Sequence, residues 1–402
     1  MMKRQIIFFI PGKTGIGECL IAIYLARQIK MSDENTQIYF FAANCYQSIL
    51  KEYHINHIVL FKNCGKMNKV LLLDRLYQND NTYLIISDII NYHTSISDWG
   101  MCNEDFSAFQ GKIYGLDIYD YENRKSDMDT YGFQASNFKN LERNFPFFDK
   151  KLVPCPIGNI NSTAGIRYTL LAKEDLVSRN GIEIQKCKKE LGVPLDKKVI
   201  LLLSALWQKE RTTYTNAEKQ IQAFDEAYEK IVEYFCTDAV VLCVGGSKKI
   251  QDGKNGFTYG INMIGSVPPL EMDKYIKIAD VLITRNIIST TVAKAALSGV
   301  PVISLICPDK NAQYRYRMYP VGWYEFLDHI VDENPYYEIV QEYNVFEFEE
   351  VVNRLKELLY GKVHNERSEK VTKYLEEIWS VGITGIFEEG MRDEVPITIN
   401  HI

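Results

Sequence analysis

The segment Ala279–Pro301 constrains the fold of this chain more than any other part of the sequence. It reads ADVLITRNIISTTVAKAALSGVP, in which a short apolar run at 281–284 is followed by a polar loop. Ser289 or Thr290 can cap a following helix, which would end at Gly299. A helix that opens on hydroxyl residues directly after a strand offers free N–H groups and the positive end of its dipole to a phosphate. The pattern predicts a strand–loop–helix–strand unit, which is common in α/β proteins and is also suited to bind phosphate.

The first half of the chain alternates strand-like and helix-like segments. Gln5–Ile10 is nearly all apolar, as expected of a parallel strand that is buried on both faces. Further strand-like runs follow at 37–41, 57–61, 83–87 and 112–116. This alternation predicts a doubly wound, mostly parallel sheet, whose ligands bind at the carboxyl ends of the strands.

Glycine-rich motifs after the first strand exclude two common nucleotide sites. The run Gly12-Lys13-Thr14 would need a glycine at Ile7 to form a phosphate-binding P-loop. Gly15 and Gly17 would need a third glycine at Leu20 to form the dinucleotide fingerprint. What remains is a glycine-rich turn that brings backbone close to a ligand, with Glu18 at the start of the next helix.

Residues 151–158, with two prolines and a glycine, predict the crossing between two domains. We therefore expect a first domain at 1–155, a second at 156–378, and a C-terminal segment at 379–402 that crosses back to the first. The sequence Asp127-Met128-Asp129 resembles a metal-binding D-x-D, but no strand leads into it, so we expect no metal site and no cofactor.

The formal net charge of −6 argues against a nucleic acid as the main partner. Nine dispersed cysteines without a C-x-x-C pair fit reduced thiols rather than disulfides or a zinc site. No apolar run approaches the length of a membrane span or a signal peptide. These observations predict a cytoplasmic protein.

The second half of the chain resembles the donor-binding domain of GT-B glycosyltransferases, especially the MurG-like and UDP-glycosyltransferase groups. The resemblance is carried by the order VVLCVGG (240–246), then INMIGSVPPLEMDKYIKIAD, then the strand–loop–helix described above. It implies two Rossmann-like domains that face a cleft. One residue departs from the pattern, because Lys294 stands where those families carry the glutamate that holds the ribose hydroxyls.

The resemblance also implies which residues bind the nucleotide-sugar donor. Val267 falls where the family's backbone pairs with the base, and Ser204 ends the strand that approaches the phosphates. Arg285 and Lys294, with the amides of Thr290 and Thr291, would stabilise the departing diphosphate in place of a metal ion. The full expected donor set is Ser204, Gly245, Gly246, Ser247, Val267, Arg285, Asn286, Ser289, Thr290, Thr291 and Lys294.

The first domain would bind the acceptor. Its glycine-rich loop is similar to the first loop of inverting GT-B enzymes, and Gly17-Glu18 matches the Gly-Asp of the heptosyltransferase group. By that likeness Glu18 is the general base, although an acid in the first turn is also a common helix-start choice. His93 is the rival base. Residues expected to line the acceptor site are Gly15, Gly17, Asp88 and Trp99.

The resemblance implies inverting, metal-independent transfer of a sugar from a nucleotide-diphosphate donor to a hydroxyl of a small-molecule, glycan or peptide acceptor. Inversion is favoured because 285–299 contains no glutamate, whereas retaining GT-B families usually carry two there. A nucleotide-sugar epimerase of the same fold and a non-catalytic nucleotide-binding homologue remain alternatives. A homodimer also remains open.

Overall fold

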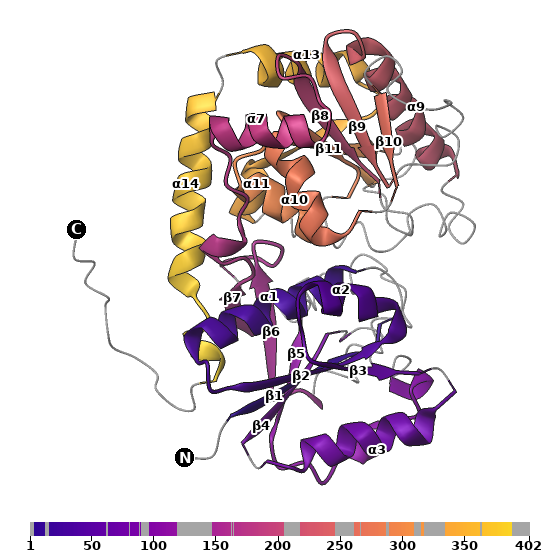
Figure 1. The fold of residues 1–402 in the computed structure, drawn as a ribbon, viewed down its shortest axis with the longest axis vertical. Coiled ribbons are helices and arrows are strands. Elements are labelled where there is room, and N and C mark those ends of the chain that lie inside the picture. Colours follow the sequence, from indigo (N-terminus) through magenta and orange to yellow (C-terminus); the bar gives the residue numbers. More distant parts are fainter. Residues whose placement is uncertain are drawn as a thin grey trace, which may run out of the picture.

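The structure of the protein is a computed structural model. It describes residues 4–12, 16–61, 63–79, 81–87, 89, 96–118, 147–161, 163, 165–204, 218–245, 261–265, 267–286, 289–308, 315–316, 334–361 and 364–387. Two α/β domains lie one above the other in Figure 1. None of the helices in these ranges is long and apolar enough to cross a membrane.

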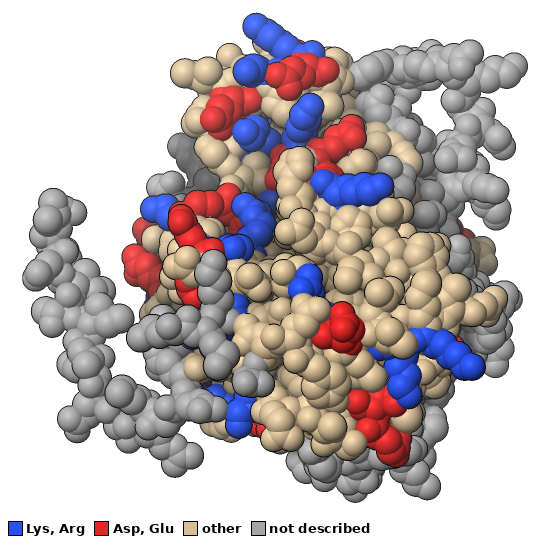
Figure 2. All heavy atoms as spheres, turned by 60° about the horizontal axis from the view of Figure 1, so that its bottom comes forward, with Lys and Arg blue, Asp and Glu red and all other residues tan. Residues whose placement is uncertain are grey.

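The first domain is built on a parallel sheet with the strand order β3-β2-β1-β4-β5-β6-β7. Helices α1 and α2 cover the side of the sheet that faces the second domain, and α3 covers the opposite side (Figure 1). Figure 2 turns that opposite side toward the viewer, where few charged side chains interrupt the surface. The elements are β1 (Gln5–Ile10), α1 (Gly17–Ser32), β2 (Gln37–Ala43), η1 (Asn44–Tyr46), α2 (Gln47–Glu52), β3 (His57–Leu60), α3 (Gly65–Leu76), β4 (Thr82–Ile86), η2 (Asn103–Phe106), β5 (Lys112–Leu116), β6 (Lys150–Cys155) and β7 (Ile166–Thr169).

The second domain repeats the same winding, with the strand order β10-β9-β8-β11-β12 and with β14 parallel to β12. Strand β13 pairs antiparallel with the end of β12. The elements are η4 (Lys173–Asp175), α7 (Gly181–Glu190), β8 (Lys198–Leu203), α9 (Glu218–Phe235), β9 (Ala239–Val244), β10 (Ile261–Ile264), α10 (Pro269–Ile278), β11 (Val281–Thr284), α11 (Thr290–Leu297), β12 (Val302–Pro308), β13 (Arg315–Tyr316), η7 (Pro335–Glu338), β14 (Val340–Asn344), α13 (Phe348–Tyr360), α14 (His364–Val381) and η8 (Thr384–Ile386).

Several inner strands of both sheets are buried along their whole length, which explains their continuous apolar sequences. All six residues of β1 and of β9 are buried, as are the four residues of β11. The prediction of two doubly wound, mostly parallel sheets is confirmed. In particular, the expected strand–loop–helix–strand unit is formed by β11, α11 and β12.

The first sheet extends beyond residue 155, where the sequence predicted the domain boundary. Strand β6 contains Pro154 and still pairs with β7, in which Tyr168 lies opposite that proline. A proline is tolerated here because the pairing of β6 with β5 already ends at Leu152. The first domain therefore includes the strand at 166–169, and the crossing to the second domain follows it.

The described part of the C-terminal segment lies on the first domain, and the return to that domain begins within α14. Thr169 of β7 donates its hydroxyl to the carbonyl oxygen of Ile378 at 2.6 Å, and its N–H to the carbonyl oxygen of Gly382 at 3.2 Å. Phe387 then packs against Tyr83 of β4, with ring centroids 5.0 Å apart. The last described residue is thus on the first sheet.

Candidate active site

Each sheet contains one point at which the strand order reverses, and these points define where a ligand binds in doubly wound folds. In the first sheet the point lies between β1 and β4, and in the second between β8 and β11. The loops that follow these four strands carry most of the residues predicted from the sequence. The site is therefore built from the carboxyl ends of these strands.

Three of the predicted donor residues converge at the reversal point of the second sheet. Leu203 and Thr284 are paired across β8 and β11, so Ser204 and Arg285, which follow them, are neighbours. The Arg285 guanidinium donates a hydrogen bond to Oγ of Ser204. Gly245 adopts φ +72°, and a Cβ at this position would collide with the carbonyl oxygen of Ser204. The glycine predicted after β9 is required for this close approach.

Arg285 is held behind the crevice rather than presented to solvent. Its side chain is 1% exposed and forms an ion pair with Asp225 of α9 at 2.9 Å. The guanidinium carbon also lies 5.5 Å from the ring centroid of Tyr228. Burial raises the pKa of the Tyr228 hydroxyl, which donates to the carbonyl oxygen of Leu203 at 2.7 Å. Arg285 therefore positions Ser204, and Asp225 positions Arg285.

Ser204 remains able to donate a hydrogen bond. An arginine side chain has donors only, so the contact with Arg285 uses an acceptor lone pair of the serine and leaves its O–H group to donate elsewhere. Because Ser204 follows the last residue of β8 at the reversal point, an anion in the crevice is the partner that this geometry favours.

Helix α11 follows β11, and its N-cap residue makes no side-chain cap hydrogen bond among the described residues. Ser289 occupies the N-cap position with extended φ −138° and ψ 133°, but its hydroxyl makes no cap hydrogen bond. The first-turn N–H groups of a helix have no partner within the helix. Thr290 is buried and Thr291 is half-buried at this end. The geometry agrees with an anion site at Thr290 and Thr291. The backbone N–H of Asn286, by contrast, donates a hydrogen bond to Oγ1 of Thr284 at 3.0 Å.

Lys294 lies one turn further along α11, and its charge is offset by a neighbour. Its Nζ is 2.7 Å from the carboxylate of Asp273 on α10, and the lysine side chain is 7% exposed. Burial raises the pKa of Asp273, against the lowering effect of Lys294. The same Nζ lies 5.9 Å from the ring centroid of Tyr24 on α1. Lys294 thus belongs to the contact between the two domains, and it does not add a free positive charge at the donor.

In the first domain, Gly12 and Glu18 form a pair that the sequence did not reveal. A Cβ at Gly12 would collide with Oε2 of Glu18, so any other residue at this position would make the carboxylate move. Glu18 is half-buried in the first turn of α1, directly after Gly17. Its carboxylate therefore lies over the loop that follows β1, at the reversal point of the first sheet.

Trp99 lies behind this same loop. The side chain is buried, and its indole Nε1 donates to the carbonyl oxygen of Pro11 at 2.9 Å. This position gives it a supporting role for the loop after β1, whereas the sequence had placed it in contact with the acceptor.

We expect Trp99→Phe to destabilise the protein by about 2–3 kcal/mol, because it opens a cavity and leaves the buried carbonyl of Pro11 without its donor. Urea unfolding measures the loss. Trp379→Phe is the matched control, since that indole is partly exposed and donates over 3.3 Å to the carbonyl oxygen of Leu171. Equal effects of the two substitutions would contradict the supporting role of Trp99.

The remaining predicted residues divide into two groups. Val267 is described, half-buried and packed against the main hydrophobic core. Outside the described residues lie Gly15, Asp88, His93, Gly246, Ser247 and the Asp127–Asp129 sequence. Among the described residues, no three His, Cys, Asp or Glu side chains are grouped so that they could hold a metal ion.

The two reversal points are joined by contacts between the domains. Glu52 of α2 accepts the N–H of Leu270 at 3.0 Å, and Arg27 of α1 forms an ion pair with Asp175. Tyr24 lies six residues after Glu18 on α1, about 9 Å along the helix axis. Since Tyr24 touches the Lys294 region of α11, the starts of α1 and α11 are each within about two helical turns of the same contact.

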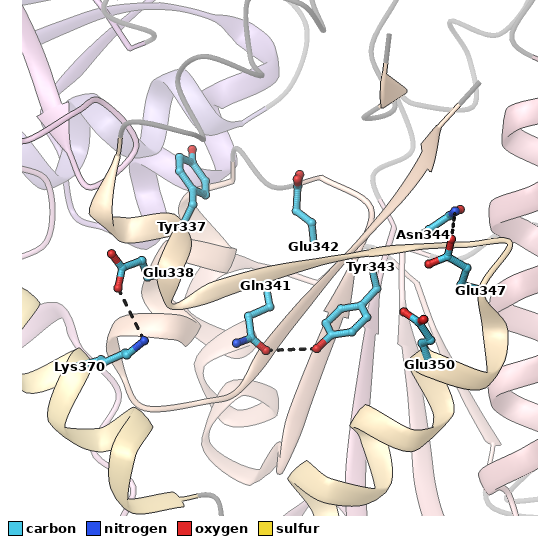
Figure 3. Close-up of a pocket in the computed structure, with 9 residues that line it drawn as sticks. All are labelled: Tyr337, Glu338, Gln341, Glu342, Tyr343, Asn344, Glu347, Glu350 and Lys370. Atoms are coloured by element: carbon cyan, nitrogen blue, oxygen red, sulfur yellow. Dashed lines mark hydrogen bonds and ion pairs between the residues drawn. The ribbon is translucent and has the colours of Figure 1, made fainter. Parts of the chain in front are cut away.

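A separate pocket of about 600 Å³ lies beside β14 and the start of α13 (Figure 3). Its lining includes Glu338, Glu342, Glu347 and Glu350, and Lys370 lies 3.7 Å from Glu338. It contains none of the predicted donor or acceptor residues, and β14 pairs with β12 away from the reversal point. The candidate site at the ends of β8 and β11 is therefore separate from this pocket.

Structural comparison shows the GT-B fold. Alr3699/HepE of Anabaena, solved with UDP-glucose, matches with a TM-score of 0.55 and 13% identity over 95% of this chain and 99% of its own. Spinosyn forosaminyltransferase SpnP matches with a TM-score of 0.52 and 11% identity, over 94% of this chain and 95% of its own. A protein described as UDP-N-acetylglucosamine 2-epimerase, from Listeria monocytogenes, matches with a TM-score of 0.52 and 14% identity, over 99% of this chain and 100% of its own.

Comparison of the sequence with curated proteins finds no match. The model of one family of unknown function, DUF6365, matches residues 25–310 and 308–383, which together make up most of the sequence. The chain belongs to the DUF6365 family and has the GT-B fold.

Proposed function

We propose that this protein is an inverting, metal-independent glycosyltransferase that moves a sugar from a nucleotide-diphosphate donor to an acceptor hydroxyl. The observation that carries the proposal is the convergence of Ser204, Arg285 and Gly245 at the reversal point of the second sheet. Similar proteins support the donor class, since Alr3699/HepE was solved with UDP-glucose and the glycosyltransferase VinC with dTDP.

The donor diphosphate would lie between β8 and α11. The Ser204 hydroxyl would donate to one phosphate, and the amides of Thr290 and Thr291 would donate to the other. These groups are fixed before the donor arrives, so they stabilise the charge that develops on the leaving diphosphate without reorganising. Arg285 contributes through Ser204, and Lys294 contributes by holding the domains together.

The acceptor would approach from the first domain. The Glu18 carboxylate would take the proton of the attacking hydroxyl, which then displaces the diphosphate from the opposite face of the sugar. A base on the acceptor side and an anion site on the donor side are the arrangement that in-line displacement requires. The space that Gly12 leaves for the carboxylate supports this role.

Donor binding is tested by thermal shift. We expect one class among UDP-, GDP-, dTDP- and ADP-sugars to raise the melting temperature by several degrees, because ligand binding to the folded state stabilises it. Ser204→Ala should lower the affinity for that donor roughly 10- to 100-fold, because a hydrogen bond to a charged group contributes about this much to binding. Ser107→Ala, which removes an exposed hydroxyl bonded to Glu104, is the control.

Binding of no nucleotide sugar by the wild-type protein would refute the proposal, and equal affinity in Ser204→Ala would remove Ser204 from the site. Transfer and its stereochemistry are then read from the anomeric configuration of the product by NMR. A rearranged sugar formed without any acceptor would identify an epimerase. A nucleotide sugar that binds and stays intact with every acceptor would identify a non-catalytic homologue.

A further inference from the structure

Helix α3 exposes an apolar face on the side of the first domain that points away from the second (Figure 1). Met67, Val70 and Leu71 are 47%, 65% and 37% exposed, and they lie at helical spacing on one face. Phe61 just before the helix and Tyr77 just after it are each 48% exposed. Scattered apolar residues on a surface are ordinary, but these five, three on α3 and one near each of its ends, are grouped, and we call them the stripe.

The stripe is held in a fixed shape. The buried Asn68 side chain accepts the N–H of Phe61 at 3.2 Å and donates to its carbonyl oxygen at 2.9 Å. At the other end, Tyr77 packs edge-on against Phe109, with centroids 6.4 Å apart. The two aromatic ends of the stripe are therefore anchored, so little conformational entropy is lost when the stripe is covered.

The stripe is also flanked by charges in a symmetric pattern. Lys66 is exposed in the first turn of α3, and Asp74 is exposed in the last turn. Both lie on the stripe side of the helix, opposite the buried residues Asn68, Leu72 and Leu76.

We propose that this face pairs with the same face of a second copy of the chain, with the two α3 helices antiparallel around a two-fold axis near Val70. In that arrangement Lys66 of one copy faces Asp74 of the other, and Met67 faces Leu71. The midpoints of these two pairs fall at residues 70 and 69, within one residue or about 1.5 Å along the helix. A two-fold interface requires this self-complementarity, and the Lys66–Asp74 pair occurs twice in it.

The interface is small. One helix face per copy is less than the roughly 800 Å² per partner of a standard stable complex, so the dimer is weak and depends on concentration. Helix α3 lies on the far side of the sheet from α1, so the pairing does not cover the contact between the domains (Figure 1).

Sedimentation equilibrium over a range of protein concentrations tests the proposal. The wild-type protein should show a reversible monomer–dimer equilibrium, and Val70→Glu should abolish it because two carboxylates would meet at the axis. Lys66→Asp alone and Asp74→Lys alone should each weaken the dimer about 10-fold, because each places like charges opposite one another in both pairs. The double variant K66D/D74K should restore the wild-type constant to within about 3-fold.

Ile182→Glu is the matched control, because Ile182 is 83% exposed on α7 in the second domain and should leave the equilibrium unchanged. Circular dichroism of each variant reports whether it is folded. A wild-type protein that stays monomeric at every concentration overturns the proposal, as does a double variant no better than the single ones. Binding of the monomer to lipid vesicles through Val70 would assign the face to a membrane instead, and it also overturns the proposal.

Discussion

Glu18→Gln is expected to lower kcat by about 10²- to 10⁴-fold while leaving donor affinity unchanged. The amide keeps the shape of the side chain but cannot accept the proton of the acceptor hydroxyl, and general-base catalysis is worth about this factor. Steady-state transfer assays give kcat, and thermal shift or calorimetry gives the donor affinity. This prediction rests on the proposed function and on the position of Glu18 at the start of α1.

Two further variants test whether the loss comes from the position of the Glu18 carboxylate. Gly12→Ala should reproduce much of the loss, because its Cβ would displace the Glu18 carboxylate. Glu34→Gln, at an exposed position after α1, should leave kcat unchanged. Transfer at the original rate by Glu18→Gln, with the donor still bound, would exclude Glu18 as the base and make His93 the next residue to replace.

Lys294→Glu is expected to destabilise the protein by about 3 kcal/mol or more. The new carboxylate would lie beside Asp273 in a buried contact between the domains, and removing one partner of a buried ion pair typically costs this amount. The family resemblance alone leads to a different expectation, since glutamate restores the residue that holds the ribose hydroxyls elsewhere. Urea unfolding of the variant separates the two expectations.

The exchange of both charges, Lys294→Glu with Asp273→Lys, should recover part of the stability. Lys277→Glu on α10 is the matched control, because its ion pair with Glu183 is more exposed and an exposed pair is worth less than about 1 kcal/mol. A Lys294→Glu variant as stable as the wild-type protein, with tighter donor binding, would show that this position serves the ribose instead.

The sheets could be predicted from the sequence because buried parallel strands leave continuous apolar runs. Gln5–Ile10 and Val281–Thr284 are buried throughout and were visible for that reason. Strand β7 has the sequence IRYT. It is only four residues long and contains an exposed arginine, so the sequence shows no continuous apolar run there. The domain boundary was consequently placed before it rather than after it.

The candidate site was predicted less completely, because its partners are far apart in the sequence. The sequence predicts Ser204 and Arg285 as separate ligands, whereas in the fold they bind each other and Arg285 also binds Asp225, which the sequence does not single out. Lys294 was chosen by its register in α11, and nothing local identifies Asp273, 21 residues earlier, as its partner. Pairings of this kind are decided by packing rather than by local pattern.

The two chain crossings between the domains are bonded to each other, and this determines how the domains can move. Thr169, where the chain leaves the first sheet, holds Ile378 and Gly382, where the chain returns to it. Two adjacent crossings that are bonded to each other are the arrangement expected of a hinge. Opening of the domains about Thr169 would also break the contacts that Glu52, Arg27 and Tyr24 make with the second domain. The part of each domain farthest from α14 would travel the greatest distance.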